Sequence, residues 1–185
     1  MADDLKTIQL SRSELREIAG YAVACARPAL AIFERERPHD RRPRAAIEAA
    51  QAFADGGERT KALRDSAWAA HQAAQEARDA GQAAASDAAR AAGHAAGAAF
   101  LHPLPKSSQV NHILGSAAYA ARAFERSAGD EPAVGLDQIM QSRLLAPPVV
   151  VEVLTRYPSA PPGGRRVGEL TRTLDASLRR SAPDR

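Results

Sequence analysis

Hydrophobic positions along this chain recur mainly at steps of three and four residues, which is the spacing of one face of an α-helix. The first such run starts at Ser11, which stands three residues before Glu14 in the pattern of a capping box, and it ends at Pro38. Pro28 lies inside the run and predicts a kink, because proline has no backbone N–H to donate. The apolar face of this segment comprises Leu15, Ile18, Ala22, Cys25 or Ala26, Ala29 and Phe33.

Further helical segments are separated by glycine and proline breaks. They are predicted over residues 42–55, 60–79, 82–101, 110–127, 134–145 and 149–157. Asp40 is the expected N-cap of the first of these. We find no convincing alternation of β-branched residues; the nearest run, 148–154, is short and continues in a helix-like pattern. The sequence therefore predicts an all-α fold, a compact antiparallel bundle of six or seven helices.

The last part of the chain differs in amino-acid composition from the rest. A proline- and glycine-rich stretch over residues 158–164 predicts a linker, and a helical step of apolar residues follows it. We expect an alanine-rich bundle domain over residues 1–158, then a linker and basic, helical tail over residues 159–185. This tail either packs on the body or folds on contact with a partner; an exposed tail is the simpler expectation.

Composition and charge narrow the function classes. The 43 alanines provide much of the 45% hydrophobic content, so close helix packing must replace large side chains. The net charge of +3 lies in residues 159–185, which leaves a neutral body and makes nucleic acid an improbable partner. No apolar run is long enough for a membrane span, and Met1–Asp4 does not resemble a secretory signal. We expect a cytoplasmic protein.

The histidines offer one candidate for chemistry. His71 and His94 fall on small-residue faces of predicted helices, and His112 follows the proline-containing loop. The helical metal spacings H-E-x-x-H and H-x-x-x-H are absent, so we expect no metal and no cofactor. One interpretation is that these three side chains are simply packed. The other is that they face one cavity, with Arg41 or Asp40 at its mouth, and bind or convert a small molecule.

The densest charged run covers residues 34–44. Its arginines could hold an anion or an acidic partner, because a guanidinium offers two parallel donors. The same run could equally be a solvated turn with internal ion pairs. Three other side chains attract attention, Cys25, Trp68 and Tyr119, and we expect all three in the core, the thiol being inert.

Several short blocks within the predicted helices are together similar to a known family. These blocks are residues 15–19, 25–26, 40–49, 70–71, 90–95, 112–120 and 141–144. They resemble the predicted immunity-protein domain found in some bacterial polymorphic-toxin loci, with coverage of about residues 12–157. Phe100 stands where that pattern would have a histidine. The resemblance implies an all-helical fold and a binding role.

Three functions follow from these observations. The first is a non-enzymatic, immunity-like protein that occludes a cognate toxin, with Arg41, Arg42, Arg44 and Glu48 and the loop 102–111 in contact with it; a homodimer is compatible. The second is a small-molecule-binding protein or enzyme using His71, His94 and His112. The third is recruitment of nucleic acid or an acidic partner by residues 159–185.

Overall fold

The computed structural model describes residues 7–181, so the N-terminal residues 1–4 and the last four residues of the basic tail lie outside the described part. Within that part the chain forms helices and no strand. The helices are α1 (Arg12–Ala26), α2 (Leu30–Glu36), α3 (Arg42–Ala54), α4 (Lys61–Asp79), α5 (Ala83–Gly97), α6 (Val110–Ser127), α7 (Pro132–Leu145), α8 (Pro148–Thr155) and α9 (Arg165–Arg180). The predicted all-α bundle is confirmed. The helices outnumber the predicted six or seven because the first predicted segment forms both α1 and α2 and the tail forms α9.

The first helical segment begins at the predicted capping box and is interrupted at the predicted kink. The Ser11 hydroxyl accepts a hydrogen bond from the Glu14 N–H, and the Glu14 carboxylate accepts one from the Ser11 N–H. The 3-10 turn η1 (Arg27–Ala29) contains Pro28 and separates α1 from α2, which confirms the predicted kink. The predicted cap of α3 needs correction. Arg41 occupies the N-cap position, while Asp40 accepts a hydrogen bond from the Arg42 N–H two residues on.

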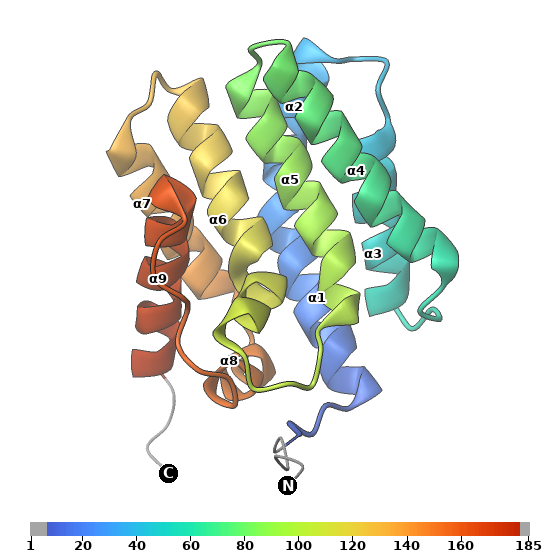
Figure 1. The fold of residues 1–185 in the computed structure, drawn as a ribbon, viewed down its shortest axis with the longest axis vertical. Helices are drawn as coiled ribbons and strands as arrows, with labels where there is room; N and C mark the ends of the chain where they lie inside the picture. The colour runs from blue at the N-terminus through green and yellow to red at the C-terminus, as the bar shows by residue number, and fades with distance from the viewer. Residues whose placement is uncertain (1–6, 182–185) are drawn as a thin grey trace, which may run out of the picture.

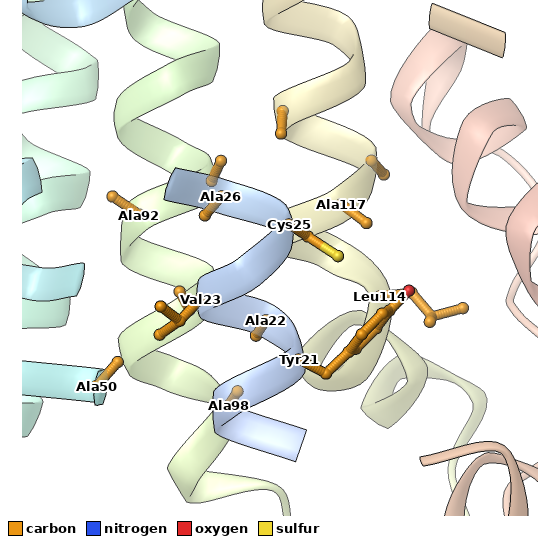
Figure 2. Close-up of a cluster of buried hydrophobic side chains, with 14 of the residues drawn as sticks. Tyr21, Ala22, Val23, Cys25, Ala26, Ala50, Ala92, Ala98, Leu114 and Ala117 are labelled. Atoms are coloured by element: carbon orange, nitrogen blue, oxygen red, sulfur yellow. The ribbon is translucent and has the colours of Figure 1, made fainter. Parts of the chain in front are cut away.

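The core is built around α5, which lies between α4 and α6 and also contacts α1, α2 and α3 (Figure 1). Seven of its ten buried residues are alanines. Such small side chains let neighbouring helices approach closely, and larger residues of α1 fill the remaining space. Figure 2 shows α1 across α5 and α6, with Val23 towards Ala50 and Cys25 near Ala117. Cys25 is buried, as expected, and burial raises the pKa of its thiol to about 11.

The basic tail is not an exposed appendage. The apolar face of α9, formed by Leu170, Leu174 and Leu178, is fully buried against the body, where α9 contacts α6, α7 and α8. Arg179 donates to the backbone oxygens of Tyr157 and Pro158 and fixes the connecting segment 158–164. The expectation of an exposed tail is therefore wrong over α9, because its leucines cover part of the core.

One further expectation needs correction. The sequence predicts Trp68 in the core, but 67% of its surface is exposed on α4. Gly93 of α5 receives the imidazole ring of His71. Tyr119 is half-buried and packs against the core. In the described part of the chain, none of the helices combines the length and the apolar character needed to cross a membrane.

Candidate functional site

Three histidines interlock with three glycines where α4, α5 and α6 meet. His71 of α4 packs on Gly93 of α5, so closely that a β-carbon on the glycine would lie 2.7 Å from Cε1 of the ring. His94 of α5 packs in the same way on Gly115 of α6, where a β-carbon would lie 2.6 Å from Nδ1. Each glycine therefore provides the space for a ring from the neighbouring helix.

The third histidine completes the interlock with a hydrogen bond. Nδ1 of His112 lies 3.1 Å from the backbone oxygen of Gly97, which continues the series of glycines in α5. The rings of His71 and His94 meet edge to face with their centroids 5.4 Å apart, and His94 stacks on Tyr119 at 5.0 Å. Aromatic contacts at these separations are favourable. The histidines thus join α4, α5 and α6.

The buried position of these rings keeps them neutral. Burial, together with the nearby His71, His112 and Arg90, lowers the pKa of His94 to about 3. Burial also lowers the pKa of His71 and that of His112. A neutral imidazole with such a low pKa is a poor proton donor or acceptor at neutral pH, because catalysis needs a pKa near the working pH.

A crevice of about 150 Å³ lies beside His94, under the connecting segment that leads to α9. We call it the histidine crevice; His94, Asn111, Gly115 and Tyr119 form its wall on α5 and α6, and residues 161–164 with the first turn of α9 close it. His71 and His112 are not part of its lining. Of the three predicted ligand-binding histidines, the structure thus brings one to a cavity and packs the other two behind it.

A second cavity, of about 370 Å³, continues from the first. We call it the arginine hollow. The two cavities share Tyr119, Gly164 and Val167. The hollow is lined by six arginines, which are Arg78, Arg90, Arg122, Arg126, Arg165 and Arg166. They come from α4, α5, α6 and α9, and Asp87 is the carboxylate among the lining residues.

The predicted mouth of a histidine cavity lies elsewhere. Asp40 and Arg41 line an open hollow at the turn between α2 and α3, which shares no lining residue with the histidine crevice. The loop 101–109 lies at the opposite end of the bundle from this turn (Figure 1). The turn and the loop therefore do not form one continuous contact surface.

The predicted partner-binding residues around this turn differ in accessibility. Arg42 donates to Asp40 and to Glu76 of α4, and the Glu34 carboxylate accepts two hydrogen bonds from Arg44 at 2.6 and 2.8 Å. These paired guanidinium groups fix the turn against α2 and α4. Arg41 and Glu48 form a loose exposed pair 3.9 Å apart. The exposed pair remains free to meet a partner, since such pairs are weak.

An exposed apolar surface lies on α7 and was not predicted from the sequence. Leu136, Met140 and Leu144 follow one another at four-residue steps on its outer side, and Leu145 lies beside them; we call these four residues the α7 stripe. Leu144 is 73% exposed. The four-residue spacing was visible in the sequence, but Ile139 of the same helix is buried, so hydrophobicity alone did not reveal which face is free.

Metal binding has no support from the clustering of side chains. Among residues 7–181 there is no group of three or more histidine, cysteine, aspartate or glutamate side chains that could hold a metal ion. The histidine side chains instead contact glycine, tyrosine and each other. The site is accordingly described by its cavities and its surfaces.

The class of protein that these features define is an alanine-rich, all-helical bundle with cavities under its last helix and an apolar stripe on its surface. Comparison with known families identifies the family to which the chain belongs. The family described as "Imm-5 like putative immunity protein" matches residues 9–145, and the chain belongs to this family. This confirms the resemblance seen in the sequence. No curated protein and no solved structure matches the chain. The matched residues include the histidine interlock and the α7 stripe, whereas α8 and α9 lie beyond them.

Proposed function

We propose that this chain is an immunity protein that binds a toxin protein and blocks its active site without catalysing a reaction. The α7 stripe supports this proposal most directly. Exposed apolar side chains on one helix face are typical of a surface that another protein covers. Membership of an immunity family suggests the class of partner, and the stripe lies within the residues that the family model matches.

Charged side chains at the edge of the stripe fit the same role. Asp137 and Arg143 of α7 form no ion pair within residues 7–181, so both charges are available to a partner. An apolar centre with charges at its edge is the usual composition of a protein interface. We infer that the stripe anchors the toxin and that these two charges orient it.

The turn between α2 and α3 provides a second proposed contact. Arg41 and Glu48 are its accessible members, while Arg42 and Arg44 hold the turn in shape through their ion pairs. This contact and the α7 stripe can be tested separately, because they lie on different helices.

A neutralisation assay tests the proposal. A candidate toxin domain, chosen from the products of neighbouring genes, would be produced in cells together with the wild-type chain or a variant, and growth would be measured. We expect Met140→Glu with Leu144→Glu to abolish protection, because two charges would be buried in the interface. Trp68→Glu, which alters an exposed apolar residue of α4, is the matched control. Full protection by the α7 double variant would exclude this surface as the anchor.

Self-association is the competing use of the stripe. An antiparallel pair of α7 helices centred on Met140 would place Leu136 opposite Leu144 of a second copy and Asp137 opposite Arg143. Light scattering with size-exclusion chromatography distinguishes the two uses. A dimer that the α7 double variant converts to a monomer would assign the stripe to a second copy. A monomer that loses toxin binding in the same variant would assign it to the toxin.

A further inference from the structure

We propose that the arginine hollow is a binding site for a small phosphorylated molecule, whose phosphate group would bridge α5 and α9. The inference starts from the excess of positive charge around a cavity. Six guanidinium groups line the hollow, with Asp87 as the lining carboxylate. This site is independent of the α7 stripe and does not depend on the immunity role.

Four of the six arginines are already held by carboxylates. Arg126 lies 2.7 Å from Asp87, and the buried Glu125 binds both Arg122 and Arg166. Arg78 has a loose, exposed contact with Asp79 at 3.7 Å. Arg122 also pairs with Asp130, and Arg166 with Glu169. These pairs keep the four guanidinium groups in place around the hollow and neutralise most of their charge.

Arg90 and Arg165 are different, because neither pairs with a carboxylate within residues 7–181. Arg90 is half-buried, with its guanidinium carbon 5.8 Å from the centre of the Tyr119 ring. Arg165 comes from the opposite wall, at the first residue of α9. Two unpaired guanidinium groups on opposite walls of one cavity suit a dianion, since phosphate accepts parallel hydrogen bonds from arginine.

The backbone at the start of α9 adds to this preference. Gly164 is the N-cap and has no side chain to cap the helix, and the first turn contains no acidic residue. The first N–H groups of α9 are thus left to an anion. Gly163, Gly164 and Arg165 have φ values of 83°, 76° and 51°. This run of left-handed backbone turns the chain into the helix at the edge of the hollow, where Gly164 and Arg165 line the cavity.

The size of the cavity suggests an ester rather than a bare ion. A volume of about 370 Å³ exceeds what one phosphate group needs and falls within the range of small-molecule sites. The half-buried ring of Tyr119 provides an apolar wall for the attached group. Because α9 lies beyond the residues that the family model matches, this site depends on the C-terminal part of this particular chain.

Isothermal titration calorimetry of the full chain, in a buffer free of oxyanions and at low salt, tests the proposal. The probes are inorganic phosphate and phenyl phosphate. We expect saturable binding of the ester, with inorganic phosphate binding more weakly at the same site and competing with it. Arg90→Gln and Arg165→Gln should each weaken binding about tenfold. Arg180→Gln, which removes the same charge from an exposed position of α9 outside the hollow, should change it less than about twofold.

Circular dichroism would confirm that each variant is folded. Equal binding of both probes would still support a phosphate site but would remove the role of Tyr119. Absence of saturable binding by either probe to the wild-type chain would overturn the proposal. So would a loss in Arg180→Gln equal to that in the two hollow variants, because it would show a general charge effect.

Discussion

The imidazole of His94 lies directly against the backbone of Gly115, and it occupies the space that any larger residue at position 115 would need. The same relationship joins His71 to Gly93. These contacts set the distances between α4, α5 and α6, and they place one face of His94 against the histidine crevice. The interlock therefore links the packing of the core to the shape of the cavities under α9.

Substitution of these glycines tests the interlock. Gly115→Ala and Gly93→Ala would each place a β-carbon within 3 Å of ring atoms, so we expect a loss of about 1–3 kcal/mol in the free energy of unfolding. Gly20→Ala in α1 is the matched control. Its β-carbon would meet Ala54 at an ordinary 3.6 Å, and alanine favours helix by about 0.5–1 kcal/mol. Urea denaturation provides the comparison; equal effects at positions 20 and 115 would contradict the interlock.

The buried histidines predict a loss of stability in acid. Since the pKa of His94 falls to about 3 in the folded chain, the unfolded chain binds more protons between about pH 3 and 6.5. The stabilising contribution is present above pH 6.5 and is lost as the pH falls towards 3, at about 1.4 kcal/mol per pH unit for one such group. Urea denaturation at several pH values gives the free energy of unfolding as a function of pH. Between about pH 3 and 6.5 this free energy should fall less steeply with decreasing pH for His94→Gln than for the wild-type chain. Identical slopes would contradict the assignment to His94.

Asp87 is expected to change stability with pH in the opposite direction, so that its contribution favours the fold in acid. Burial raises the pKa of its carboxyl to about 6, although Arg126, Arg122 and Arg90 act in the other direction. Arg126 Nε lies 2.7 Å from Oδ2, and burial outweighs this contact in setting the pKa. The charged form therefore destabilises the fold above pH 6, and protonation relieves this as the pH falls through 6.

The test for Asp87 is the substitution Asp87→Asn. We expect it to increase the free energy of unfolding at pH 7.5 by about 1–2 kcal/mol, because the amide fills the same space without a buried charge. Asp79→Asn, at an exposed position, should change it by less than about 0.5 kcal/mol. Destabilisation by Asp87→Asn alone would show that its contact with Arg126 outweighs burial.

The docking of α9 depends on a buried carboxylate. Glu125 is fully buried and accepts hydrogen bonds from Arg166 of α9 and from Arg122. Gly135 of α7 makes room for it, because a β-carbon there would collide with the carboxylate. Glu125→Gln would remove the buried charge that two half-buried guanidinium groups share and would leave them only the exposed carboxylates of Asp130 and Glu169. We expect a loss of about 2–4 kcal/mol in the free energy of unfolding.

Limited proteolysis would report the release of α9 in that variant as faster cleavage in the connecting segment 158–164. Glu169→Gln serves as the control, since this exposed carboxylate also pairs with Arg166. Exposed pairs contribute about 1 kcal/mol or less, so its cleavage rate should stay close to that of the wild type. Equal cleavage of the two variants would show that Glu125 does not hold α9.

Local signals in the sequence predicted the helices well. The Ser11–Glu14 capping box and the kink at Pro28 depend on residues near in sequence, and both are present in the structure. The ends of α6 and α7 also agree closely with the breaks after Ser127 and before Pro147. Helix periodicity and capping are short-range properties, so one sequence was enough to predict them.

The candidate sites depend on contacts that are distant in sequence. Arg90 and Arg165 are far apart in the chain, and nothing in their local sequence predicts that they line one hollow. The exposure of Trp68 and of Leu144 is likewise set by which face of a helix its neighbours leave uncovered. Helical spacing identified His71 and His94 as inward-facing, but only the three-dimensional packing shows that His94 alone reaches a cavity.

The central proposal is tested most directly by calorimetric titration of a candidate toxin domain, chosen from the products of neighbouring genes and purified. The titrants are the wild-type chain, Met140→Glu/Leu144→Glu and Trp68→Glu. The account predicts tight one-to-one binding by the wild type and by Trp68→Glu, and a loss of at least about a hundredfold in the α7 double variant, as expected for the centre of an interface. No binding of the wild-type chain, or equal binding by the α7 double variant, would contradict it.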